Sequence, residues 1–263
     1  MKIATWNVNS IRTRQGLVCD WLQANPVDVL CVQETKVVDP DFPREPFTAL
    51  GYDLAVSGQK SYNGVAIMSR SPLNDVEIGF SPRLGAEVVG ELDVQKRAIA
   101  ATVNGIRIIN LYVPNGGDYN SDKYDYKLRW LNQLYDYTKL TLDKYADVCI
   151  CGDFNIAPDD RDIHTPPGKT PIVGTTPVER EALQRLLGLG LADAFRKFNS
   201  EAQQYSWWDY RAGAFPRNRG WRIDHHYLTE ALYKRASACI IDREPRQWTK
   251  PSDHTPVVVE WPD

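Results

Sequence analysis

The feature that most constrains this fold is a series of short apolar segments spread along the whole chain. They cover residues 2–6, 27–32, 64–68, 87–94, 98–103, 106–113, 148–151, 223–228 and 256–261. Each has the length and composition of a β-strand, and several are continuously apolar, which is typical of strands buried on both faces. Asn104-Gly105 separates two of them and predicts a tight hairpin.

Helical patterns lie between some of these segments. Apolar side chains recur at helical spacing over residues 17–22, and one apolar stripe runs through residues 122–144. Thr176, Pro177 and Glu179 form a good helix start, with a Thr cap, a Pro at the first position and a Glu three residues after the cap. Strands with intervening helices predict the α/β class, as two sheets packed face to face and covered by helices.

The chain shows no clear division into domains. It has 263 residues, of which 43% are hydrophobic, so one sizeable core is possible. No stretch is rich enough in Gly, Ser or Pro to act as a linker, and the irregular residues 157–177 are typical of a functional loop. We expect a single domain over residues 1–263.

Charge and cysteine content limit the location and the partners. The formal net charge is −3, so any contact with nucleic acid must use local basic clusters and bound metal rather than one broad basic surface. The five cysteines are an odd number and match no zinc-binding spacing, which favours free thiols in a reducing compartment. The chain shows no signal peptide and no apolar run that could span a bilayer, so we expect a cytoplasmic protein.

Polar residues suited to metal and phosphate chemistry follow the ends of the apolar segments. They are Asn7, Glu34, Asp153, Asn155, Asp224, Asp253 and His254. Each alone is usually a turn residue or a solvated charge. Several of them, however, occupy the same position at the end of an apolar segment. This favours a functional site, because sites in layered α/β folds gather at strand ends.

Hydrolysis of a phosphodiester needs this set of groups. Glu34 is the best ligand for a hard divalent cation, and Asn7 offers a neutral oxygen. Asp224 can orient the imidazole of His254. Asp153 can position or deprotonate water, while Asn155 can donate to a phosphoryl oxygen.

Seven stretches in order carry a family resemblance. They are TWNVN at residues 5–9, VQETK at 32–36, NLYVPNG at 110–116, GDFNIAP at 152–158, SWWDYR at 206–211, NRGWRID at 218–224 and PSDHTPV at 251–257. From the first residue to the last, the chain resembles the exonuclease III family of abasic-site endonucleases, within the endonuclease/exonuclease/phosphatase superfamily.

The resemblance implies a fold and an activity. It implies a four-layer α/β sandwich of two packed mixed sheets flanked by helices. The expected enzyme uses Mg²⁺, or Mn²⁺ in its place, to cut duplex DNA on the 5′ side of abasic sites. It also removes 3′ blocking groups and degrades DNA from 3′ ends. We expect it to act as a monomer.

The resemblance also assigns roles. Glu34 is the main metal ligand, supported by Asn7 and Asp253, and Tyr112 lies against the scissile phosphate. Asp153, Asn155 and the Asp224–His254 pair are catalytic, and either Asp153 or that pair is the base. The implied pocket for the base-free sugar consists of Trp207, Trp208 and Trp221.

Residues that touch DNA are expected in two places. Arg211, Arg219 and Arg222 alternate with aromatic residues, so they can take phosphates while the rings pack on a sugar or base. In the loop after residue 157, His164 or Lys169 is expected to contact the DNA backbone. His225 and His226 replace apolar residues of many relatives, and a hydrogen-bonded core histidine is the favoured interpretation over a second metal ligand.

Two other functions remain open at this stage. One is an RNA-binding regulator on the same fold that does not cut nucleic acid. The other is a superfamily phosphatase or phosphodiesterase with a different substrate. The complete catalytic set argues against the first, and the match of residues 206–211 and 218–224 to the DNA enzymes argues against the second.

Overall fold

The computed structural model describes residues 1–165, 168 and 170–262. Its strands are β1 (Lys2–Asn7), β2 (Val29–Gln33), β3 (Asp53–Ser57), β4 (Val65–Ser69), β5 (Asn74–Ile78), β6 (Ala98–Val103), β7 (Ile106–Tyr112), β8 (Val148–Asp153), β9 (Leu191–Asp193), β10 (Asp224–Thr229), β11 (Ala238–Ile241) and β12 (Val257–Glu260). Its helices are α1 (Ile11–Ala24), α2 (Glu45–Ala49), α3 (Ser81–Leu84), α4 (Ala86–Val89), α5 (Asp122–Lys144), α6 (Pro177–Leu187), α7 (Ala194–Phe198) and α8 (Glu230–Arg235), with 3-10 helices η1 (Asp39–Asp41), η2 (Gly90–Asp93), η3 (Asp160–Asp162) and η4 (Glu244–Gln247).

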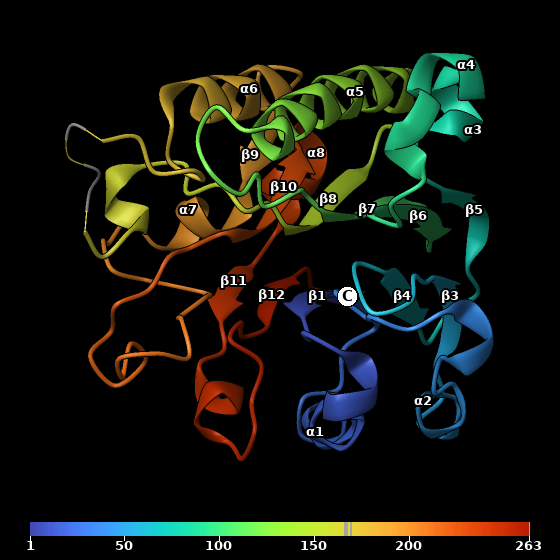
Figure 1. The fold of residues 1–263 in the computed structure, drawn as a ribbon. Helices are drawn as coiled ribbons and strands as arrows, with labels where there is room; N and C mark the ends of the chain where they lie inside the picture. Colours follow the sequence, from blue (N-terminus) through green and yellow to red (C-terminus); the bar gives the residue numbers. More distant parts are fainter. Residues whose placement is uncertain (166–167, 169, 263) are drawn as a thin grey trace.

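The elements form four layers. One six-stranded sheet has the order β11-β12-β1-β2-β4-β3 and the other has the order β5-β6-β7-β8-β10-β9. Figure 1 shows the two sheets facing each other, with α1 and α2 outside the first and α5 and α6 outside the second. The expected α/β sandwich of two mixed sheets is confirmed.

Three apolar clusters hold the layers together. Ile3, Val29 and Ile108 belong to the core between the sheets. Trp130 and Leu183 lie in the cluster that packs α5 and α6 against the second sheet. The third cluster joins the first sheet to α1 and α2. Burial on both faces explains why β2, β4 and β8 are buried along their whole length.

Local sequence signals set several boundaries. Helix α5 has the predicted limits because the Ser121 side chain accepts the Tyr124 N–H at its start, and its apolar stripe faces the sheet. Helix α6 begins with the predicted capping box between Thr176 and Glu179. The hairpin residues Asn104 and Gly105 both have positive φ, at 49° and 82°.

One predicted strand is wrong. Residues 87–93 belong to α4 and the 3-10 helix η2 instead, and Val94 lies in the turn that follows. Val89 and Leu92, three residues apart, are buried, while Val88 and Val94 are 63% and 70% exposed, so the burial has a helical rather than an alternating period. Strands β3, β5, β9 and β11 were not predicted, because they are short or carry polar residues at sheet edges.

Within the described residues, every helix is too short or too polar to cross a lipid bilayer.

Candidate active site

The predicted polar residues meet at one rim of the sandwich because of the strand directions. Strands β1 and β2 run parallel, as do β7 and β8, so the carboxyl ends of each pair lie at a common edge. Strand β10 runs antiparallel to β8 and begins at this edge with Asp224 opposite Asp153. A cavity of about 280 Å³ opens there. It is lined by Glu34, Tyr112, Asn115, Asp153, Asn155, Val173, Trp207, Trp221, Ile223, Asp253 and His254.

Several residues at this rim have a left-handed backbone. Asn9, Glu34, Lys36 and Asn155 have φ values of 45°, 51°, 55° and 48°. Such values are uncommon for residues other than glycine and cluster at functional sites when the surrounding structure enforces them. Here they turn the chain sharply after β1, β2 and β8, which brings the side chains over the strand ends.

His254 lies between two buried carboxylates. Its Nδ1 is 2.9 Å from Asp224 Oδ2, and its Nε2 is 3.7 Å from Asp153 Oδ2. Burial opposes the charged imidazole, but the negative charges of Asp224 and Asp153 outweigh burial and raise the pKa of His254 to about 10. The ring therefore carries both protons at neutral pH.

Ser206 fixes the carboxylate that orients this histidine. Its hydroxyl donates to Asp224 Oδ2 at 2.6 Å and accepts the backbone N–H of Asp224. Ser206 was not predicted, although it lies within one of the seven stretches. The hydroxyl leaves Asp224 little freedom to turn, so the imidazole keeps one orientation.

Asp153 is buried and is held by amides. Its Oδ2 accepts from Asn7 Nδ2 at 2.9 Å, and its Oδ1 accepts the backbone N–H of Asn155 at 2.9 Å. Burial raises the pKa of Asp153 to about 7, although the His254 charge acts in the opposite direction. A carboxylate with this pKa can exchange protons near neutral pH.

Glu34 lies across the cavity beside a lysine. Its Oε2 is 2.8 Å from Lys36 Nζ, and its Oε1 accepts from Asn7 Nδ2 at 2.9 Å. Burial opposes ionisation, yet Lys36 and Asn7 together lower the pKa of Glu34. The Asn7 oxygen accepts the Asn9 N–H, so Asn7 presents its nitrogen to the carboxylates and would turn over to ligate a cation.

Tyr112 and Asp253 complete the polar lining. Burial, followed by the charges of Glu34 and Asp153, raises the pKa of Tyr112 well above its usual value, so its hydroxyl stays a donor. Asp253 accepts from Trp207 Nε1 at 3.1 Å. Burial acts to raise the pKa of Asp253, but the His254 charge and that hydrogen bond outweigh burial and lower the pKa.

The sugar-pocket prediction needs one correction. Trp207 and Trp221 line the cavity with ring centroids 6.1 Å apart in an edge-to-face arrangement. Trp208 is fully buried in a separate cluster with Tyr205 and Ala214, and its indole N–H donates to Asn218. Neighbouring residues in an extended segment point to opposite sides, so Trp207 and Trp208 cannot share one pocket.

Known proteins resemble this chain in sequence and in fold. A sequence profile described as "Endonuclease/Exonuclease/phosphatase family" matches residues 4–254. The chain belongs to this family. It is 34% identical to exodeoxyribonuclease III of Haemophilus influenzae, over 99% of this chain and all of that one. It is 33% identical to an exodeoxyribonuclease of Bacillus subtilis, over 98% of both.

Solved structures agree with this assignment. An AP endonuclease from Archaeoglobus fulgidus superposes with a TM-score of 0.92 at 41% identity, covering 100% of both chains. The 3′ phosphatase NExo from Neisseria, bound to a product DNA hairpin, gives 0.94 at 39% identity, again over 100% of both chains. The predicted resemblance to exonuclease III and the AP endonucleases is confirmed.

Endonuclease/exonuclease/phosphatase nucleases are metal-dependent, and the described residues include groups that can hold an ion. Asp153, Asp224 and His254 bring ligand atoms within 4.8 Å of one another. Within this group, however, Asp224 and His254 already bond to each other, with His254 Nδ1 2.9 Å from Asp224 Oδ2. Glu34 and Asp253 are ionised oxygen donors on the cavity wall, and oxygen donors are what a hard divalent cation takes.

The structure corrects one of the predicted DNA contacts. Arg222 is 1% exposed and pairs with Asp162 and Asp193, so it cannot reach a phosphate. Arg211 and Arg219 are exposed, and Arg211 pairs with Asp209. His164 is also exposed, whereas Lys169 lies outside the described residues.

Both unusual histidines are buried. His225 Nδ1 faces Arg222 Nη1 at 3.1 Å, and its Nε2 lies 3.1 Å from the Ile156 carbonyl. Burial and the Arg222 charge lower the pKa of His225 to about 4, so it is a neutral, hydrogen-bonded core histidine, as favoured. His226 lies on the opposite face of β10, between the two sheets.

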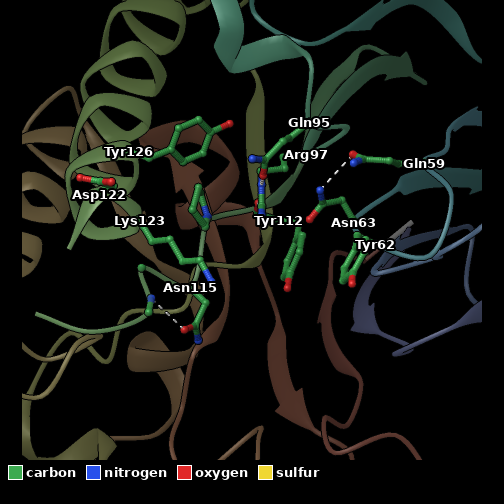
Figure 2. A pocket seen from close by; sticks show the side chains of 13 residues that line it. Gln59, Tyr62, Asn63, Gln95, Arg97, Tyr112, Asn115, Asp122, Lys123 and Tyr126 are labelled. Atoms are coloured by element: carbon green, nitrogen blue, oxygen red, sulfur yellow. Dashed lines mark hydrogen bonds between the residues drawn. The ribbon is translucent and has the colours of Figure 1, made fainter.

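A second hollow, the groove, adjoins the cavity. It measures about 660 Å³ and shares Tyr112 and Asn115 with the cavity lining. Figure 2 shows the Tyr62 and Tyr112 side chains extending in the same direction, with Lys123 and Asn115 on the side of Tyr112 away from Tyr62. Sequence reasoning missed this groove, because its residues come from four separate segments that only the fold brings together.

Proposed function

We propose that this chain is a DNA repair nuclease that hydrolyses the phosphodiester on the 5′ side of abasic sites in duplex DNA. The observation that carries the proposal is one rim where Glu34, Tyr112, Asp153 and the Asp224–His254 pair surround a cavity with an apolar wall. Relatives named exodeoxyribonuclease III, AP endonuclease and 3′ phosphatase support it. They also support 3′-5′ exonuclease and 3′-end-cleaning activity.

The cavity fits a base-free sugar. Trp207, Trp221 and Ile223 supply apolar surface directly beside His254. With a volume of about 280 Å³ and this apolar wall, the cavity would take a sugar and its phosphate. Extruding an abasic nucleotide from duplex DNA is also less costly than extruding a paired one, since it breaks no base pair.

The protonation states assign the chemical roles. With a pKa of about 7, Asp153 can accept a proton from the attacking water as its oxygen bonds to phosphorus. The bond from phosphorus to O3′ breaks, and the departing O3′ takes up a proton from solvent to give a 3′-hydroxyl. His254 stays cationic and donates from Nε2 to a phosphoryl oxygen, while Asp224 holds its orientation. Tyr112 and Asn155 add hydroxyl and amide donors at the same rim.

We propose Mg²⁺ as the metal, with Mn²⁺ as a substitute. Glu34 would be the main ligand, with Asp253 and, after its amide turns over, Asn7 in support. When bound, the cation neutralises charge on the phosphate and stabilises the leaving oxygen.

The groove beside the cavity would hold the neighbouring nucleotides. Arg97 and Lys123 bring positive charge, and Tyr62, 70% exposed, offers a ring for a sugar or base. Arg211, Arg219 and His164 remain proposed contacts on exposed surface elsewhere.

Three further properties belong to this proposal. Residues 1–263 would form one catalytic domain, because the rim draws on both sheets. All five cysteines, each in the described part of the chain, are free thiols, which supports a cytoplasmic location. We propose a monomer, since one chain supplies the whole catalytic set.

The test is nicking of a labelled duplex that holds one stable abasic-site analogue, with Mg²⁺ and with chelator. We expect a single metal-dependent cut 5′ to the analogue, lost in Glu34→Gln. Glu230→Gln is the matched control, because Glu230 is an exposed glutamate paired with Lys234 far from the cavity, and it should cut normally. An intact duplex at high enzyme with either Mg²⁺ or Mn²⁺ would overturn the proposal and turn attention to RNA binding.

A further inference from the structure

A cluster of sulfur and nitrogen donors lies in the core between the sheets. Cys149 and Cys151 project from the same face of β8, and His226 on β10 lies directly opposite Cys151. All three are buried, and a ligand atom of each lies within 4.8 Å of the other two. No Cys and His spacing in the sequence matches a zinc motif, because two sheet strands rather than one loop bring these residues together.

The imidazole of His226 is oriented as a ligand would be. Its Nε2 is 2.9 Å from the Val257 carbonyl, which only accepts, so Nε2 carries the proton in the neutral ring. The lone pair is then on Nδ1, which faces Cys149 Sγ at 3.7 Å. Metal-binding histidines characteristically donate their other N–H to a carbonyl or carboxylate in this way.

A fourth donor comes from the opposite sheet. Cys31 on β2 is fully buried and belongs to the same core cluster as Cys149 and Cys151. Three thiols and one imidazole, without any carboxylate, are a donor set that suits Zn²⁺ in a closed tetrahedral site and does not suit Mg²⁺.

We propose that Cys31, Cys149, Cys151 and His226 bind one Zn²⁺ ion that links the two sheets. The site is separate from the oxygen donors of the cavity and does not depend on the proposed nuclease function. It lies directly beneath the rim, since Cys151 and His226 are each two residues from Asp153 and Asp224 on the same strands. Because the site is closed to solvent, the ion enters as the chain folds.

The first test uses wild-type protein refolded under reducing conditions with Zn²⁺ or Co²⁺, followed by extensive dialysis. We expect one zinc ion per chain by elemental analysis and a higher Tm than for protein refolded with chelator. With Co²⁺, thiolate-to-metal charge-transfer bands should appear, and the oxygen donors at Glu34 cannot produce them. Metal-free protein with the same Tm in both preparations would overturn the proposal.

Variants identify the ligands. His226→Phe and Cys31→Ser should lose the bound zinc and the cobalt bands. Cys239→Ser is the matched control, because Cys239 is another buried thiol in the same core and is not a proposed ligand. If Cys239→Ser loses the metal and Cys31→Ser keeps it, the proposed ligand set is wrong. If a variant fails to fold, the zinc-dependent Tm of the wild type still decides the question.

Discussion

Lys127 and Glu179 form an ion pair with an Nζ–Oε1 distance of 2.5 Å, and neither side chain is exposed to solvent. Lys127 also donates to the backbone carbonyls of Asn155, at 2.8 Å, and Asn115, at 3.3 Å. Glu179 in turn accepts the N–H groups of Gly174 and Thr176. The pair therefore connects helices α5 and α6 to the loops that carry both cavity asparagines.

Replacing Lys127 with Met should lower kcat more than it changes KM. Breaking a buried pair costs about 3–5 kcal/mol of stability, because Glu179 is left buried and charged. A shift of Asn155 by about 1 Å could lower kcat about 100-fold. The double variant Lys127→Met, Glu179→Gln removes the buried charge and keeps an acceptor oxygen for the N–H groups of Gly174 and Thr176, so it should regain part of the stability in urea unfolding but not kcat in the nicking assay. Recovery of both would show that the pair only stabilises the fold.

Asp162→Asn should change how the protein unfolds in acid. Burial opposes its charge, but Arg222 and Arg196 lower the pKa of Asp162, so the unfolded chain takes up a proton first as pH falls. The stability from Asp162 is present above its unfolded pKa of about 3.9 and is lost as the pH drops through the lower folded value. The variant should be less stable at neutral pH and lose less stability in acid. Urea unfolding of the wild type and the variant across this pH range measures how the free energy of unfolding of each changes with pH. Parallel curves for the two proteins would contradict the prediction.

The meeting of the polar residues at one rim was predictable, because the ends of apolar strand segments can be recognised in the sequence. Asn7, Glu34, Asp153 and Asp224 each follow or begin an apolar segment, and the parallel pairs leave little choice of edge. Helix α5 was predictable for a similar reason, since its cap and its apolar stripe agree.

The orientation of irregular segments was not predictable. Residues 199–223 have no periodicity, so only tertiary partners decide that Trp207 faces the cavity while Trp208 and Arg222 face the interior. The two histidines show the same limit. Alternation in a strand places His225 and His226 on opposite faces, and both are buried because β10 is covered on both sides.

The two adjacent tryptophans should separate function from stability. Trp207→Ala removes a wall of the cavity and the donor to Asp253, so we expect weaker discrimination between abasic and intact duplex with a small change in Tm. Trp208→Ala should instead cost about 3–5 kcal/mol of unfolding free energy, because it leaves a core cavity. Nicking rates on both duplexes, together with thermal unfolding, compare the pair. Equal losses of selectivity in both variants would place Trp208 in the pocket after all.

Lys123 and Lys139 test the groove, because both are exposed lysines on helix α5. Lys123 lines the hollow beside the cavity, whereas Lys139 lies about 24 Å further along the helix axis at the usual rise per residue. If the groove carries a DNA backbone, Lys123→Ala should weaken binding and reduce the slope of log Kd against log salt by about 1. Lys139→Ala should leave both quantities unchanged. Binding titrations of an abasic duplex with chelator present, over a range of salt, isolate this effect from cleavage. An unchanged slope for Lys123→Ala would mean that the strand leaves the cavity by another path.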